Sequence, residues 1–349
     1  MAKPTTRPLP DERALRDRLL QIVDTFGRRT VLVIGDLIAD EFIYGEVARV
    51  SREAPVLILK YDTTQVIPGG AGNAANNVAA MGGGAMLAGL VGMDSEGRRL
   101  LASFPRQVDR SQVVKSRQYR TPVKTRILAG GAHSAKQQVV RIDRETGWPL
   151  SVDVSRAFAD GIEAALTACD AVVLSDYGSG LVTPALAAAV AAGLKRRGRA
   201  AVPVLLDSRY RLLEYRGLTT CTPNESEVEQ ALGVTIGDDR SVLERAGRAL
   251  LKRTGSAAVL VTRGSRGMAL FEADRPTVHV PIFGSDEVAD VTGAGDTVIA
   301  AFGLALAAGA SFYEAARLAN YAGGVVVMKR GTATVSAGEI AEAVTRAGG

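Results

Sequence analysis

Cysteine and histidine are scarce: the 349 residues of the chain include only two of each. Cys169 and Cys221 cannot form a disulfide framework, and because both lie in or beside apolar runs we expect packed thiols rather than nucleophiles. His133 and His279 are far apart in the sequence, so a zinc site or a Ser-His-Asp triad is hard to build from them. The sequence therefore does not favour zinc, thiol or serine-triad chemistry.

Long apolar runs and concentrated charge are also missing. The N-terminus has no apolar segment of the kind found in signal peptides, and no stretch is long enough to span a membrane. The formal net charge is only +5, and Lys and Arg are spread along the chain rather than gathered into a basic run. We therefore expect a cytoplasmic protein that binds neither nucleic acid nor membrane, and whose mild positive charge suits anionic small molecules.

What the chain does contain is a series of short apolar runs separated by Ala- and Leu-rich segments of helical period. Continuous apolar runs are typical of strands that are buried on both faces of a sheet, and strand–helix alternation implies a parallel sheet between two layers of helices. We predict an α/β fold with a doubly wound, mostly parallel sheet. The predicted strands lie at 30–36, 85–94, 170–178, 202–209, 257–264 and 268–273.

Two stretches, 41–67 and 120–145, break this rhythm because polar and apolar residues alternate in them. They predict antiparallel strands, the second pair turning at 129–136, that would form a small antiparallel β lid on the main fold. The predicted organisation is an N-terminal helical extension at 1–27, a main domain at 28–340 that includes the lid, and a C-terminal tail at 341–349.

The stretch DVTGAGDTV, residues 290–298, places three small residues in front of a predicted helix. The free N–H groups of a helix start attract anions, and Gly293 and Gly295 allow a phosphate to approach the backbone closely. Asp296 has two interpretations: an acidic residue favoured by the helix dipole, or a general base beside an anion hole. The second interpretation predicts phosphoryl transfer to an alcohol.

Two further stretches are candidates for binding a phosphate donor, because the chain has no GxxxxGK[ST] loop. In TPNESEVE, residues 222–229, Asn224 and Glu227 would lie on one face of a helix that begins at Pro223 and could hold magnesium through water. Ordinary helix capping is the alternative for this pair. VTRGSRG, residues 261–267, ends a predicted strand in a glycine-bracketed turn that could accept a nucleotide.

The stretch PGGAGNAANN, residues 68–77, is a candidate sugar site. Gly69 and Gly70 precede a predicted helix that carries Asn73, and amide side chains pair with hydroxyls as both donor and acceptor. Asp36, at the end of the first predicted strand, would add a carboxylate. A tight turn followed by polar helix residues is the alternative. Three basic residues of the second lid stretch either face this sugar or stand in solvent: Lys124, Arg126 and Arg141.

These stretches resemble the signature regions of the PfkB/ribokinase sugar kinases. PGGAGNAANN and DVTGAGDTV resemble the two signatures, TPNESE the Asn-x-x-Glu motif, VTRGSRG the nucleotide loop and ANYAGGVVVMKRGTATVS the closing segment. The likeness extends over residues 28–340 and is greatest to the D-glycero-β-D-manno-heptose 7-phosphate kinases of ADP-heptose synthesis. It implies a ribokinase-like fold, ATP and Mg²⁺ as cofactors, a homodimer formed through the lid, and in some members a monovalent cation near Asp286 and Val288.

The resemblance also implies roles for individual residues. Asp296 would be the catalytic base, and the anion hole for the transferred phosphate would be formed by Gly293, Ala294 and Gly295. Sugar hydroxyls would be bound by Asp36, Gly69, Gly70 and Asn73. Magnesium, phosphates and nucleotide would be met by Asn224, Glu227, Thr262, Arg263, Gly264, Gly267 and Asn320.

Two departures from the heptose kinases concern a remote phosphate of the substrate. Where those kinases usually carry Lys after SDYG this chain has Ser179, and Asp207-Ser208-Arg209 replaces Asp-Pro-Lys. A basic residue at either place can meet a phosphate, so Arg209 is the candidate substitute here. The alternative functions are a kinase for ribose, fructose or adenosine, and a non-catalytic sugar- or nucleotide-binding regulator on the same fold.

Overall fold

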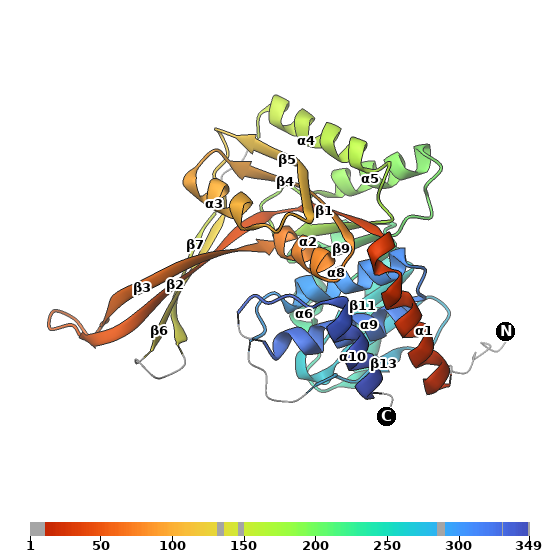
Figure 1. The fold of residues 1–349 in the computed structure, drawn as a ribbon. Helices are drawn as coiled ribbons and strands as arrows, with labels where there is room; N and C mark the ends of the chain where they lie inside the picture. The colour runs from red at the N-terminus through yellow and green to blue at the C-terminus, as the bar shows by residue number, and fades with distance from the viewer. Residues whose placement is uncertain (1–10, 131–135, 146–149, 285–289, 330, 348–349) are drawn as a thin grey trace.

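The computed structural model describes residues 11–130, 136–145, 150–284, 290–329 and 331–347. A nine-stranded sheet forms the body, and a four-stranded sheet projects from it (Figure 1). In spatial order the nine strands are β13 (Val278–Val280), β12 (Met268–Glu272), β11 (Ala258–Thr262), β10 (Thr220–Cys221), β9 (Val204–Ser208), β8 (Ala171–Asp176), β1 (Thr30–Gly35), β4 (Gly84–Gly92) and β5 (Val108–Ser116). Neighbours from β11 to β5 are parallel, whereas β12 and β13 pair antiparallel. The predicted mostly parallel sheet is therefore confirmed.

Helices cover both faces of this sheet. One hydrophobic cluster includes side chains of α1 (Glu12–Asp24), η1 (Phe26–Arg28), α2 (Ala71–Ala80), α3 (Ser95–Ser103), α8 (Ala294–Ala307), α9 (Phe312–Val327) and α10 (Ala337–Ala347). The other includes side chains of α4 (Val152–Ala165), α5 (Pro184–Arg196), η2 (Leu212–Glu214), α6 (Glu225–Leu232) and α7 (Arg240–Thr254). In β1, Val31 and Val33 join the first cluster while Leu32 and Ile34 join the second. Burial on both faces is why the strand reads as a continuous apolar run.

The projecting sheet is the lid, with strand order β3 (Leu57–Gly70), β2 (Leu37–Val50), β6 (Val123–Gly130) and β7 (Gln137–Arg144). Each hairpin is antiparallel, but β2 and β6 pair parallel. The expectation of a purely antiparallel lid was therefore wrong. The reason is that β2 follows β1 and β6 follows β5, so both hairpins leave the parallel body in the same direction and their first strands run side by side (Figure 1).

The chain ends pack against each other and against the body. Helix α1 buries Leu15 and Leu19, and it contacts α10. The boundary expected at residue 340 falls inside α10, where Ile340 and Val344 are buried in the same cluster as α1. Cys169 and Cys221 are buried free thiols, as expected. Across the described ranges, no helix has the length and apolar character needed to cross a membrane.

Candidate active site

The candidate site lies at the carboxyl ends of the central parallel strands, where ligands collect in doubly wound folds. Asp36 directly follows β1, Tyr177 directly follows β8, and Asp207 is near the end of β9. The first turn of α8 carries Asp296 to the same place, because its carboxylate is hydrogen-bonded to Tyr177. The fold thus brings residues from four distant segments together.

Asp296, in the first turn of α8, has only 3% of its surface exposed. Its Oδ1 accepts a hydrogen bond from the Tyr177 hydroxyl at 2.9 Å, and its Oδ2 accepts one from Asn73 Nδ2 at 2.8 Å. Burial raises the pKa of Asp296 to about 6, although both hydrogen bonds oppose the shift. At the start of α7, by contrast, hydrogen bonds from Ser241 lower the pKa of Asp239. A raised pKa is suited to a proton acceptor and is unlike that of an ordinary capping aspartate.

The glycines before Asp296 shape the start of α8. Gly293 is the N-cap with φ of 78°, and a Cβ added there would lie 2.4 Å from Asn73 Nδ2. A Cβ added at Gly295 would meet no atom within 4 Å. The helix, which begins at Ala294, therefore presents an open backbone surface beside the carboxylate, as an anion site at a helix N-terminus requires.

Asp36 is the second buried carboxylate, with 1% of its surface exposed. It accepts hydrogen bonds from the backbone N–H groups of Tyr177 at 2.8 Å and Ser179 at 3.3 Å, and from the Ser179 hydroxyl. Burial raises the pKa of Asp36 to about 6. The residue that replaces the lysine of the heptose kinases thus holds this carboxylate.

The glycine pair before α2 is needed for close packing. Gly70 has φ of 58°, and a Cβ there would lie 2.6 Å from the backbone oxygen of Asp36. A Cβ at Gly69 would lie 2.3 Å from Asp40 Oδ2. Asn73, in the first turn of α2, is 1% exposed and its Nδ2 donates to Asp296. The predicted sugar-binding residues therefore lie together around the predicted base.

Tyr177 was not singled out in the sequence, although the strand-end segment SDYG pointed to its neighbourhood. Its ring lies beneath two cations, with Lys124 Nζ at 5.0 Å and the Arg209 guanidinium carbon at 5.4 Å from the ring centroid. Burial lowers the pKa of Lys124, and the nearby charge of Arg209 adds to the effect. Among the described residues, neither cation forms an ion pair.

The other two basic lid residues are placed differently. Arg126 pairs with Asp40, and both side chains are mostly buried. Arg141 is half exposed and its Nε donates to Asp143 Oδ1 at 2.9 Å on the same strand. Of the three lid cations predicted to meet the sugar, Lys124 reaches the site unpaired, whereas carboxylates of the lid hold the other two.

On the side of the site that is predicted to bind the phosphate donor, called the donor side below, Asn224 and Glu227 form a capping box at the start of α6. The backbone N–H of Asn224 donates to Glu227 Oε2 and that of Glu227 donates to Asn224 Oδ1, each at 2.9 Å. The helix begins at Glu225 rather than at Pro223, because Asn224 is its N-cap. The two side chains are therefore partners across the cap rather than neighbours on a helix face. Burial raises the pKa of Glu227.

Asp207 extends this acidic region. Burial raises the pKa of Asp207 well above its usual range, and the charges of Glu227 and Asp296 add to the shift. The carboxylates of Asp207 and Glu227 are thus close enough to repel each other, and a bound cation would relieve that repulsion. Among the described residues, no cluster of three or more His, Cys, Asp or Glu suited to a metal is found. A magnesium ion at this place would therefore need water or phosphate oxygens as further ligands.

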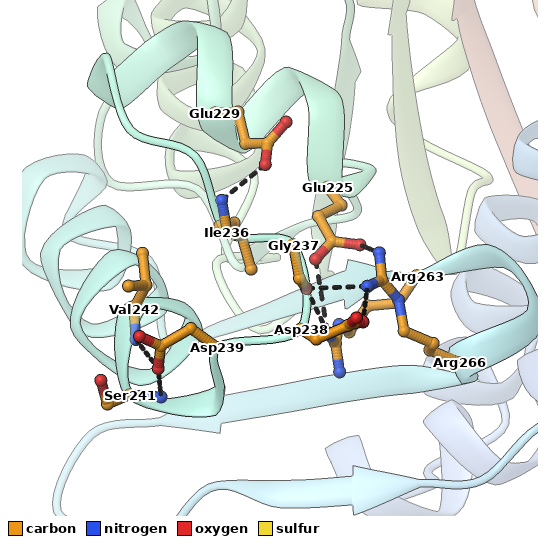
Figure 2. A network of polar contacts seen from close by, with 10 residues as sticks. All are labelled: Glu225, Glu229, Ile236, Gly237, Asp238, Asp239, Ser241, Val242, Arg263 and Arg266. Carbon is orange, nitrogen blue, oxygen red and sulfur yellow. Dashed lines mark hydrogen bonds and ion pairs between the residues drawn. The ribbon is translucent and has the colours of Figure 1, made fainter.

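An ion-pair network ties the predicted nucleotide loop to α6 (Figure 2). Arg263 Nη2 lies 3.3 Å from both Glu225 Oε1 and the Gly237 oxygen. Arg266 also pairs with Glu225, and its Nη1 donates to Asp238 Oδ1 at 2.7 Å. The Arg263 side chain is only 7% exposed. Its guanidinium therefore lies against Glu225 of α6, where it holds the loop in place, and does not face open space.

The remaining predicted nucleotide residues surround the same loop. Thr262 ends β11 and forms a bridge to Asn224. The turn η3 (Gly264–Arg266) follows, and at Gly267, with φ of 77°, a Cβ would lie 2.2 Å from the Val280 oxygen. Asn320 of α9 donates to the Pro281 oxygen at 2.9 Å. Asp286 and Val288, predicted near a monovalent cation, and His133 lie outside the described residues.

This α/β fold places a buried carboxylate beside a helix N-terminus, an arrangement that suits phosphoryl transfer. The sequence pattern of the pfkB family carbohydrate kinases matches residues 28–337, so the chain belongs to the PfkB family and is a carbohydrate kinase.

Known proteins support this membership. The bifunctional protein HldE of Geobacter metallireducens is 43% identical over 311 residues, which are 88% of this chain and 61% of that protein. HldE of Caulobacter vibrioides is 40% identical over 336 residues, 95% of this chain and 67% of that protein. The chain thus spans about three fifths to two thirds of the length of these relatives.

Solved structures share the fold. Arabidopsis thaliana ribokinase, solved with ribose and ATP, superposes with a TM-score of 0.67 at 22% identity, covering 90% of this chain and 98% of that chain. Escherichia coli phosphofructokinase-2, solved with potassium, gives a TM-score of 0.71 at 18% identity, covering 91% and 98%. At these identities the likeness concerns the fold alone.

Proposed function

We propose that this kinase transfers the γ-phosphate of ATP to a hydroxyl of D-glycero-β-D-manno-heptose 7-phosphate, giving the 1,7-bisphosphate and ADP. The observation that carries the proposal is the buried carboxylate of Asp296, whose pKa is raised to about 6, beside the open start of α8. The 43% and 40% identity to proteins named HldE supports the choice of sugar, together with the resemblance of the motifs to heptose kinases.

The reaction follows from this arrangement. Asp296 takes the proton of the acceptor hydroxyl while the hydroxyl oxygen forms a bond to the γ-phosphorus. The bond from that phosphorus to the β–γ bridging oxygen breaks, and ADP leaves with the bonding electrons. The backbone N–H groups at the start of α8, around Gly295, stabilise the charge on the transferred group. Asp36 and Asn73 hold the remaining sugar hydroxyls.

Lys124 and Arg209 support an acceptor that already carries a phosphate. Two like charges share the Tyr177 ring, and in the described part of the chain no carboxylate within ion-pair distance neutralises either of them. A doubly charged phosphate placed between them would offset both the desolvation of Lys124 and the repulsion from Arg209. With an unphosphorylated sugar, Lys124 would remain both desolvated and repelled by Arg209.

The donor side fits ATP and a hydrated magnesium ion. Asp207 and Glu227 would hold the ion through water, and it would neutralise the charge of the donor phosphates. The loop at 262–267 and Asn320 would border the nucleotide. In-line geometry would place its terminal phosphate at the start of α8.

We also propose that the lid forms a homodimer contact. Several apolar lid side chains are about half exposed or more, which is uncommon for a surface without a partner: Val50, Leu57, Tyr61, Val140 and Ile142. Sedimentation velocity that finds only monomers across a wide concentration range would remove this part of the proposal.

The experiment that tests the function is a panel of sugars and sugar phosphates, each incubated with ATP and magnesium and scored by ADP release. We expect a strong preference for the heptose 7-phosphate. Preference for an unphosphorylated pentose, for fructose or for adenosine would replace the substrate while keeping a kinase. Nucleotide or sugar binding without ADP release from any acceptor would favour the regulator instead.

A further inference from the structure

Tyr177 makes three kinds of contact at the centre of the candidate site. Its hydroxyl donates to Asp296 Oδ1 at 2.9 Å, and its backbone N–H donates to Asp36 Oδ2 at 2.8 Å. Its ring lies beneath Lys124 and Arg209, at 5.0 Å and 5.4 Å. One residue therefore contacts the proposed base, the proposed sugar carboxylate and both unpaired cations.

The contact to Asp296 restricts how the base can point. Tyr177 holds Oδ1 and Asn73 holds Oδ2, so the plane of the carboxylate is set from both ends. Each carboxylate oxygen has about two lone-pair sites, so one on each oxygen is left for a substrate proton. Both partners are neutral, and neutral donors reduce the basicity of a carboxylate less than a paired cation does.

We propose that Tyr177 is a positioning residue whose hydroxyl holds Asp296 in the orientation that receives the acceptor proton, and whose ring links this orientation to the Lys124–Arg209 cation pair. The proposal rests on the proposed function, because it is Asp296 that takes the proton. Acceptor binding and base orientation then depend on one side chain.

The charges around Asp296 come from several elements. Asp40 of β2 and Asp207 of β9 oppose its ionisation, whereas Lys124 of β6 favours it. Burial is the largest influence and raises the pKa, and the hydrogen bond from Tyr177 partly offsets it. Loss of that bond therefore moves the pKa of Asp296 further upward, in the direction that weakens the ionised base at low pH.

The test is Tyr177→Phe, which keeps the ring and the backbone N–H but removes the hydroxyl. We expect kcat to fall roughly tenfold, the acceptor KM to change by less than about threefold, and the acidic limb of the kcat profile to move about one unit to higher pH. The matched control is Tyr215→Phe, because the buried Tyr215 hydroxyl donates to Asp176 Oδ2 at 2.7 Å. The control is expected to lose stability without moving the limb.

A second measurement does not need turnover. Titration of ¹³C-labelled aspartate carboxyl groups by NMR, with Asp296→Asn to assign the signal, is expected to give a higher Asp296 pKa in Tyr177→Phe than in the wild type. If Tyr177→Phe does not fold, incorporation of difluorotyrosine at 177, a stronger hydrogen-bond donor, is expected to shift the same pKa downward.

The outcomes separate the two proposals. An Asp296 titration and an acidic limb that are both unchanged in Tyr177→Phe would overturn the positioning role while leaving the kinase intact. Absence of ADP release from the wild type with every sugar would remove the proposed function, and the NMR titration would still decide whether Tyr177 holds the carboxylate.

Discussion

On the acceptor side of the site, the carboxylates of Asp36 and Asp296 are held by neutral donors, whereas on the donor side charged groups hold one another. Asp36 and Asp296 are 1% and 3% exposed, and burial raises the pKa of each to about 6. On the donor side, Glu225 pairs with Arg263 and Arg266, and Arg266 is 40% exposed.

This contrast separates chemistry from support. A buried carboxylate held by neutral donors stays basic enough to accept a proton near neutral pH. Glu225 is instead neutralised by two arginines, one mostly buried and one partly exposed, so these charges can hold a loop without taking part in the reaction. Substitution of the buried carboxylate Asp296 should therefore change turnover, and substitutions in the ion pairs of the donor side should change nucleotide binding.

The largest expected effect is that of Asp296→Asn. The change keeps the shape of the side chain but removes the base, so we expect kcat to fall by about 10²–10⁴-fold. Coupled measurement of ADP release checks this, with circular dichroism to show that the fold is kept. Turnover close to that of the wild type would exclude Asp296 as the base.

The same substitution, which is expected to lower turnover, is expected to raise stability at neutral and alkaline pH. The pKa of Asp296 rises from its ordinary 3.8 to about 6 on folding, so its stabilising contribution is present below the lower value and is lost as pH rises through the higher one. We therefore expect Asp296→Asn to melt above the wild type at pH 8 but not at pH 4. Equal differences at the two pH values would show that the carboxylate is not held at a raised pKa.

Two glycine substitutions compare strain with open space at the start of α8. Gly293→Ala places a Cβ 2.4 Å from Asn73 Nδ2 at φ of 78°. We therefore expect stability to fall by about 1–3 kcal/mol, and we expect activity to fall as well. At Gly295 no atom lies within 4 Å of an added Cβ. Gly295→Ala should keep its stability yet lower kcat, because the methyl group would stand where the phosphate is bound. Thermal unfolding and kcat measured on both variants check the contrast.

A smaller effect is expected from the unpaired cations. Lys124→Gln and Arg209→Gln should each raise KM for the phosphorylated acceptor by about 10–100-fold, because each removes a charge-assisted contact to its phosphate. The matched control is Arg141→Gln, whose half-exposed side chain pairs with Asp143 on the lid. A KM that rises equally in all three variants would indicate a general effect of lid charge and not a phosphate site.

Much of the fold followed from local patterns in the chain. A threonine before a proline is typical of a helix start, and at the start of α5 the Oγ1 of Thr183 accepts the Leu186 N–H at 3.1 Å. Continuous apolar runs predicted the buried strands because burial on both faces leaves no polar alternation. The lid strands were predicted from their alternating polar and apolar residues. The parallel pairing of β2 with β6 depends on where the hairpins leave the body, and no local sequence pattern reveals this.

The site was predictable where backbone shape demands glycine or where a helix begins. Gly293 and Asp296 were singled out in this way, and Asn73 was singled out from the amide side chains of its helix. Tyr177 was not, because its contact with the site depends on a hydroxyl that reaches a residue 119 positions away. The side chain of Arg263 was expected beside the nucleotide, but its partner is Glu225, 38 positions earlier in the chain.

The smallest expected effect tests the donor side through Glu225→Gln. The change leaves the mostly buried Arg263 without its carboxylate, so we expect stability to fall by about 1–3 kcal/mol. The loop at 262–267 would be held less firmly, and KM for ATP should rise a few-fold while kcat stays within about twofold. Glu342→Gln, which breaks an exposed pair with Arg346, is the control and should change neither quantity. A fall in kcat comparable to that of Gly295→Ala would mean that the ion pairs act on the transferred phosphate itself, and the distinction between the two sides of the site would be lost.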